Sequence, residues 1–154
     1  MIAAYRIFKP RHAASAFTGE GARLYGGRFN TKGTAVVYTG GSVALAAFEM
    51  LVHLDSHGVL ETYQMCRVEF DESLVLDLDP KHLPSDWRQD PVPASTQMLG
   101  DDWVTAGSSA VLRVPSAVVP QDSNYLLNPA HPDFARIVIH AAAKFTYDPR
   151  VLKK

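Results

Sequence analysis

The chain has 154 residues, 47% of them hydrophobic and 20% charged, which is the composition of an ordinary folded protein. This length suits one domain, and the composition argues against a disordered or fibrous protein. Lysine and arginine number 15 against 16 aspartates and glutamates, giving a formal net charge of -1. No run of basic residues forms the footprint of a nucleic-acid-binding surface, so we expect no direct nucleic-acid partner.

The cysteine count and the N-terminus predict a cytoplasmic protein. Cys66 stands alone, so it can form neither an intrachain disulfide nor a thiolate metal cluster. Residues 1–8 lack the apolar core of a signal peptide, and no apolar stretch reaches the ~18 residues of a membrane span. We therefore expect a soluble protein of the reducing cytosol with no membrane partner.

Strands and one apolar helix are predicted in the first half of the chain. Residues 4–8 suit a buried strand, and residues 19–30 contain four glycines that oppose regular structure and allow a ligand to approach the backbone. Residues 35–39 predict a second strand, which a Gly-Gly pair ends before Ser42, a favourable N-cap. The helix predicted over residues 42–54 has almost no polar face, so we expect it to be buried on nearly all sides.

The second half predicts further strands and one more helix. The strands are residues 62–70, 74–78, 110–114 and 136–140. Residues 84–93 look irregular, residues 96–105 predict a short helix with Trp103 on its inner side, and residues 115–135 form a loop rich in Pro, Asn and Asp. Because helices and strands do not alternate regularly, we predict a compact α+β (mixed α/β) domain and not a doubly wound sheet.

Glu49 is the most informative single residue. A carboxylate on an apolar helix costs free energy to bury unless a partner pairs with it or a reaction uses it. His53, one helical turn later, is one candidate partner. A glutamate that merely ties a loop or an arginine in place is the alternative, and the pattern of the helix does not separate the two.

Four further residues are candidates for a site. Arg28 follows a Gly-Gly pair, where a planar cation and flexible backbone can approach a phosphate together, and Arg6 is a charge inside an apolar strand. A structural salt bridge is the alternative for either arginine. Tyr38 ends a strand that leads into the Glu49 helix, so the two can share one site, although a core aromatic is also common. Ser116 lacks a Gly-x-Ser-x-Gly context, which favours hydrogen bonding over a nucleophilic role.

Several familiar motifs are missing from the sequence. It contains no P-loop, no Gly-x-Gly-x-x-Gly fingerprint and no His-Glu-x-x-His helix. Among the six histidines, only His53 and His57 have a ligand-like spacing, and they fall at a helix end beside Gly58. We therefore expect no metal site.

Three motifs carry a resemblance to a known family. They are Gly19–Asn30 (GEGARLYGGRFN), Val36–Tyr38 and Ala44–His53. Together they closely resemble the RES-domain family, which is named for an arginine, a glutamate and a serine that fall here on Arg28, Glu49 and Ser116. Phe29 stands where many members carry tryptophan, a change that keeps an aromatic ring. The resemblance covers essentially the whole chain and predicts one RES domain over residues 1–154.

Later segments continue this resemblance. They are Thr96-Gln97, Gly100–Trp103, Val114–Ser116, Asn124-Tyr125, Asn128-Pro129 and Phe145–Val151. The family resemblance implies a fold related to ADP-ribosyltransferases of the diphtheria-toxin type, with NAD+ as substrate and no metal. It implies Arg28, Tyr38 and Glu49 as catalytic residues, and Arg6, Arg28, Tyr38 and Ser116 as residues that bind NAD+.

The resemblance also implies roles for these side chains. Glu49 would stabilise the positive charge that develops on the ribose as nicotinamide departs. Arg28 and Arg6 would hold the pyrophosphate or ribose side of NAD+ through paired hydrogen bonds. Tyr38 would pack on the nicotinamide or its ribose. The acceptor stays open: water gives a glycohydrolase, phosphate a phosphorylase, and a protein side chain an ADP-ribosyltransferase.

Similarity to this family further implies a cellular role. The protein would be the toxin of a type II toxin–antitoxin system, arresting growth by NAD+ depletion or by mono-ADP-ribosylation of a cellular protein. Its partner would be an Xre-type helix-turn-helix antitoxin whose C-terminal part blocks the NAD+ site and which itself binds operator DNA. The alternative hypothesis is a catalytically silent binding module in which Arg28 and Glu49 form a structural ion pair.

Overall fold

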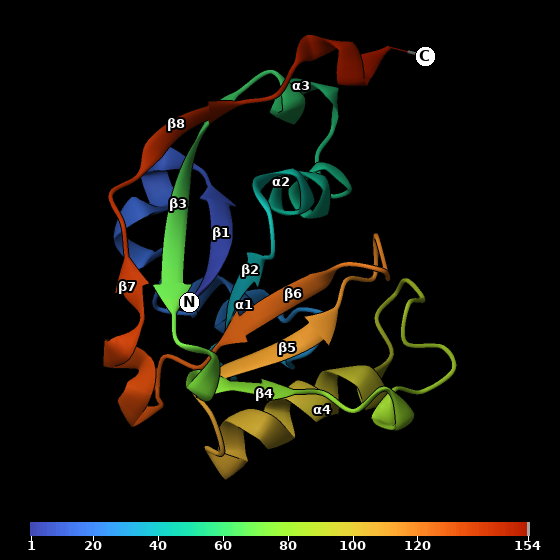
Figure 1. The fold of residues 1–154 in the computed structure, drawn as a ribbon. Coiled ribbons are helices and arrows are strands. Elements are labelled where there is room, and N and C mark those ends of the chain that lie inside the picture. Colours follow the sequence, from blue (N-terminus) through green and yellow to red (C-terminus); the bar gives the residue numbers. More distant parts are fainter. Residues whose placement is uncertain (154) are drawn as a thin grey trace.

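The computed structural model describes residues 1–153, and its strands form one curled sheet (Figure 1). The eight strands run in the order β4-β5-β6-β2-β1-β3-β7, with β8 also pairing with β3. Their bounds are β1 Ile2–Phe8, β2 Val37–Gly40, β3 Thr62–Phe70, β4 Val75–Asp77, β5 Val111–Pro115, β6 Ser123–Leu127, β7 Val138–Ile139 and β8 Ala143–Thr146. The pair β4–β5 is parallel, and the remaining pairs among residues 1–153 are antiparallel.

Helices cover parts of this sheet. The α-helices are α1 Glu20–Tyr25, α2 Val43–Leu51, α3 Ser56–Val59 and α4 Ala94–Ala106, and the short 3-10 helices are Pro10–Ser15, Glu72–Leu74, Pro80–His82, Pro132–Arg136 and Pro149–Leu152. In Figure 1, α2 lies beside β1 and β2, and α4 runs beneath β4 and β5. The predicted α+β (mixed α/β) domain is confirmed. None of the helices in residues 1–153 has the length and apolarity that a membrane crossing requires.

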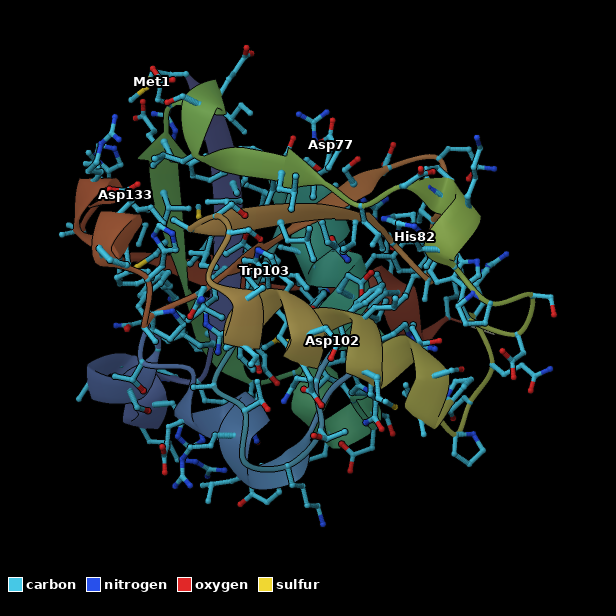
Figure 2. All side chains as sticks on the ribbon, turned by 90° about the horizontal axis from the view of Figure 1, so that it is seen from below. Met1, Asp77, His82, Asp102, Trp103 and Asp133 are labelled. Carbon is cyan, nitrogen blue, oxygen red and sulfur yellow. The ribbon has the colours of Figure 1, made fainter. Side chains whose placement is uncertain are left out.

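The core fills both faces of the β5–β6–β2 part of the sheet. Side chains alternate between the faces of a strand, so neighbouring residues enter different layers. Val111 and Leu127 pack with residues of β1 and β3, whereas Leu112 and Leu126 pack with Trp103 of α4. Trp103 is 5% exposed and points from α4 toward the sheet, as the helix prediction required (Figure 2).

The turn between β2 and α2 sets the position of the Glu49 helix. The Ser42 side chain accepts a hydrogen bond from the Leu45 amide, which confirms the predicted N-cap. At Gly40, two residues before Ser42, β2 and α2 approach so closely that a Cβ atom would lie 2.9 Å from the Ala46 nitrogen. The glycine therefore permits contact between strand and helix backbones, and α2 starts directly against the sheet.

The prediction that this helix is buried on nearly all sides is wrong. The helix spans Val43–Leu51, and only Leu45 and Ala46 within it are buried. Phe48 is 48% exposed, and Val52 just beyond the helix is 53% exposed. The physical reason is that α2 packs mainly on β1 and β2, with Tyr147 bonded to the Ala47 carbonyl, and this packing leaves Phe48 and Val52 open to solvent.

Three further segments differ from the predictions. The stretch 19–30 contains the helix α1, because glycines with positive φ stand at its two ends and leave helix-forming residues between them. The expected loop 115–135 contains β6, whose Tyr-Leu-Leu signal was outweighed by polar and proline-rich flanks. The strand expected at 136–140 is reduced to β7, because a 3-10 helix occupies the residues up to Arg136.

Gly100 provides a test of the packing of α4. A Cβ atom at this position would lie 1.7 Å from the Phe29 carbonyl oxygen, a backbone atom that cannot swing aside. We expect Gly100→Ala to lower the free energy of unfolding by about 1–3 kcal/mol, the usual range for overpacking, or by more. Chemical denaturation measures this loss.

Gly21→Ala is the matched control, because no atom lies within 4 Å of a Cβ there. Alanine favours helices over glycine, so this variant is expected to unfold at the same denaturant concentration or a higher one. Equal stability of the two variants would contradict the close contact between α4 and Phe29.

Candidate active site

The Glu49 carboxylate is held by residues from two strand ends. Its Oε1 atom accepts hydrogen bonds from Ser116 Oγ at 2.5 Å and from Asn124 Nδ2 at 2.9 Å. Ser116 directly follows β5, and Asn124 belongs to β6. The two strands pair antiparallel up to Pro115 and Ser123, which brings both donors to one end of the hairpin, next to α2.

Ser116 has no hydrogen-bonding capacity left for a ligand. Its side chain is fully buried, and its Oγ accepts bonds from the amides of Val118 at 3.1 Å and Val119 at 3.0 Å while it donates to Glu49. A hydroxyl carries one proton and two lone pairs, so all three are used. The structure therefore places Ser116 behind the carboxylate, where it orients Glu49, and its contact with NAD+ stays a prediction.

Tyr38 ties the glycine-rich loop, which is the segment 26–31 after α1, to β2. Its hydroxyl donates to Asn30 Oδ1 at 2.6 Å and accepts from the Phe29 amide at 3.0 Å. Burial raises the pKa of Tyr38 far above its ordinary value, with Asp101 adding to the rise and the Phe29 bond and Arg28 opposing it. The phenol is therefore neutral at physiological pH, and its ring is the part left for contact with a ligand.

Arg6 bridges the two strands where they separate. β1 and β2 pair at Tyr5 and Gly40 alone, and beyond that point Arg6 Nη1 donates to the Tyr38 carbonyl at 3.0 Å. The Arg6 Nε atom is buried and has no hydrogen-bond partner among residues 1–153. Burial lowers the pKa of Arg6, but arginine remains charged in proteins.

Arg28 holds the irregular segment 84–93, which was correctly predicted to lack regular structure. Its Nη1 atom donates to the carbonyls of Trp87 at 2.8 Å and Gln89 at 2.9 Å. In turn Arg88 Nε donates to the Ala117 carbonyl at 2.9 Å, next to Ser116. The segment is thereby fastened both to the glycine-rich loop and to the end of β5 that carries Ser116.

The charged groups of the site do not neutralise one another. No ion pair within 4.0 Å joins Arg28 to Glu49, so the structural pair of the alternative hypothesis is not formed in residues 1–153. The expected pairing of Glu49 with His53 is likewise not formed, because His53 lies on the exposed side of the chain after α2. Arg6 also lacks an acidic partner in this part of the chain.

α4 supports the glycine-rich loop from the other side. Gln97 Nε2 donates to the Gly27 carbonyl at 3.0 Å, and Asp101 accepts from both the amide and the hydroxyl of Thr31 at 2.9 and 2.6 Å. The sequence indicated Gln97 and Asp101 only through the family resemblance, and their contacts with Gly27 and Thr31 were not predicted. Their spacing of four residues on one helix is the signal that could have shown a shared face.

The structure thus gathers the predicted residues in two groups. Arg6 donates to the Tyr38 carbonyl, and Phe29, the residue after Arg28, donates its amide to the Tyr38 hydroxyl. Glu49 follows on the helix after β2, with Ser116 and the unforeseen Asn124 behind it. No group of three or more metal-ligating side chains occurs in residues 1–153.

Comparisons with known proteins show the family of this chain. The model of the RES domain matches residues 3–149. "Toxin Res" of Yersinia enterocolitica is 41% identical over 148 residues, covering 96% of this chain and 97% of that protein. "Prs ADP-ribosylating toxin" of a Sphingobium strain is 36% identical over 146 residues, covering 93% and 91%.

The fold has a counterpart among solved structures. A chain of the MbcT–MbcA toxin–antitoxin complex of M. tuberculosis superposes with a TM-score of 0.75 at 18% identity, covering 97% of this chain and 86% of that one. The fold and site define a small α+β domain in which two arginines bond only backbone carbonyls and a glutamate is held by Ser116 and Asn124. The chain belongs to the RES-domain family, as the sequence motifs predicted.

The hydroxyl of Tyr38 can be tested for its part in holding the loop. Tyr38→Phe leaves the Phe29 amide and the buried Asn30 side chain without this partner, which costs about 1–3 kcal/mol per unsatisfied group. We expect a lower free energy of unfolding in urea. Tyr25→Phe is the control, because Tyr25 is 79% exposed, and an equal effect of both changes would contradict the role of the buried hydroxyl.

Proposed function

We propose that this protein is the toxin of a type II toxin–antitoxin system and that it cleaves the nicotinamide–ribose bond of NAD+. The observation that carries the proposal is the set of charges without partners: Arg6 and Arg28 have no acidic partner, and Glu49 has no basic one, among residues 1–153. All three side chains are partly buried, and charges withdrawn from water in this way cost free energy unless a ligand compensates them. The names of the Yersinia and Sphingobium relatives support the same function.

The donors present suit a dinucleotide with a pyrophosphate. Arg28 uses only Nη1 for its protein contacts, and Arg6 uses Nη1 and keeps a buried Nε without a partner. Guanidinium groups with free donors bind phosphate oxygens through paired hydrogen bonds. We assign the pyrophosphate or the adjoining ribose of NAD+ to these two side chains.

Glu49 supplies the charge that bond cleavage requires. Departure of nicotinamide leaves positive charge on the ribose, and a carboxylate fixed in advance stabilises this charge without reorganising during the reaction. The Ser116 and Asn124 bonds provide that fixation. Tyr38 contributes its ring to the nicotinamide or its ribose, while its hydroxyl stays with the loop.

The acceptor of the ADP-ribose determines how growth would stop. Transfer to water or phosphate would deplete NAD+, whereas transfer to a protein side chain would inactivate a target. The relative named as an ADP-ribosylating toxin of Prs supports the transfer reaction, and it is 36% identical to this chain.

We further propose an antitoxin partner and a cytoplasmic site of action. The MbcT–MbcA complex pairs a toxin with an antitoxin, which supports a cognate partner here. We expect an Xre-type helix-turn-helix protein whose C-terminal part covers the NAD+ site. NAD+ as substrate and the lone, reduced Cys66 both suit the cytosol.

Nicotinamide release by the purified protein tests the reaction. We expect release from the wild type and a loss of about 10²-fold or more in kcat for Glu49→Gln, because the variant lacks the charge that stabilises the transition state. Glu61→Gln is the matched control, because Glu61 lies on the surface beside Lys9 and His57. Equal activity of a folded Glu49→Gln protein would contradict the proposed role of the carboxylate.

Radiolabelled NAD+ separates the acceptors. The label is carried on the adenylate part, and the wild type is incubated with antitoxin-free cell lysate before electrophoresis. A labelled protein band that is missing with Glu49→Gln is the result expected for protein transfer. Label confined to small molecules would show instead that water or phosphate accepts the ADP-ribose.

A further inference from the structure

Asn124 holds the Glu49 carboxylate in a way that costs the protein a buried hydrogen bond. Its Nδ2 atom donates to Glu49 Oε1 at 2.9 Å, while its Oδ1 atom is buried and has no partner among residues 1–153. The amide orientation follows from this contact, because the flipped amide would turn its oxygen toward the carboxylate. An unsatisfied buried acceptor is normally avoided, so the donor to Glu49 is the interaction that the site retains.

The two oxygen atoms of Glu49 have different surroundings. Oε1 receives both protein bonds, from Ser116 and Asn124, whereas Oε2 accepts none from residues 1–153. Oε2 is also not among the buried atoms without a partner, so it reaches solvent. The carboxylate is therefore anchored by one oxygen and presents the other.

We propose that Asn124 is a positioning residue for catalysis: with Ser116 it fixes Oε1 of Glu49, so that Oε2 is the oxygen that faces the reacting ribose. Two donors on one oxygen restrict both the rotamer and the tilt of the carboxylate, which a single donor does not. Small displacements of a catalytic group cost large factors in rate. The inference rests on the proposed cleavage of NAD+, since it names how the same site is aligned.

Asn124 and Ser116 differ in the hydrogen bonds that they make besides the one to Glu49. The Ser116 hydroxyl also organises the turn after β5 through the amides of Val118 and Val119, so its removal disturbs the backbone as well as Glu49. The Asn124 side chain has no other hydrogen bond within residues 1–153. Substitution of Asn124 is therefore the cleaner test of the alignment of Glu49.

The test compares Asn124→Ala with Asn124→Asp. Alanine removes the donor, whereas aspartate keeps the shape but places an oxygen with negative charge against Oε1, and like charges at this distance repel. We expect kcat for nicotinamide release to fall about tenfold in N124A and about 100-fold in N124D, with little change in KM, because the alignment acts on the transition state. A role limited to filling space predicts the opposite order, since aspartate has nearly the shape of asparagine.

Asn128→Asp is the matched control. Asn128 directly follows β6 and is 2% exposed, but its Oδ1 accepts a bond from the Ala130 amide, a bond that aspartate can also accept. We expect N128D to keep the wild-type kcat and KM. Circular dichroism and thermal unfolding of all variants establish that the comparison is made between folded proteins.

Crystal structures of the wild type and N124D distinguish this inference from the proposed function. Displacement of the Glu49 carboxylate in N124D, together with the order wild type above N124A above N124D, is the expected result. Activity in N124D equal to or above that of N124A, or an unmoved carboxylate, would overturn the positioning role. If the wild type released no nicotinamide, the proposed function would fail, and the position of the carboxylate in the two structures would still decide the inference.

Discussion

The site depends on the contact between one carboxylate oxygen and two donors that arrive from the far half of the chain. Glu49 sits on a helix that touches the sheet with a single face, so helix packing alone leaves its side chain free to move. Ser116 and Asn124 remove that freedom from the other direction. The β5–β6 hairpin thus orients a side chain that belongs to α2, and the sheet holds the hairpin and α2 in their relative positions.

The second constraint is that charges without partners destabilise the folded protein. A structural arginine commonly pairs with an acid, yet Arg6 and Arg28 donate only to backbone carbonyls among residues 1–153. Backbone carbonyls accept hydrogen bonds from the guanidinium groups but do not neutralise their positive charge. Tyr38 relates these two arginines, because Arg6 bonds its carbonyl while its hydroxyl accepts the amide of Phe29, the residue after Arg28.

Local patterns predicted most elements because the information lay within a few residues. The bounds of β3 match the predicted strand 62–70, and the predicted N-cap Ser42 caps α2. β6 was missed because two of its five residues, Ser123 and Asn124, are polar, and the Asn124 side chain bonds Glu49. The exposure of Phe48 was missed because an apolar pattern does not reveal how many neighbours a helix has.

In the candidate site too, features that depend on nearby residues were predicted and features that depend on distant contacts were not. Arg28, Tyr38 and Glu49 were predicted from motifs, while the saturation of Ser116 and the contact of Asn124 depend on atoms distant in sequence. Spacing along a chain contains no record of such contacts, and a single sequence offers no covariation to expose them. The tertiary structure was needed to separate residues that present themselves to a ligand from residues that stand behind them.

The separation of Glu49 from its two holders also bears on how the protein is made. Ser116 follows Glu49 by 67 positions in the sequence, and Asn124 follows it by 75. A nascent chain emerging from the ribosome carries Glu49 and Arg28 long before it carries the hairpin that aligns the carboxylate. The proposed site is therefore incomplete through most of the translation of the chain, and under the proposed function this interval is available for a partner protein to meet the chain before the site forms.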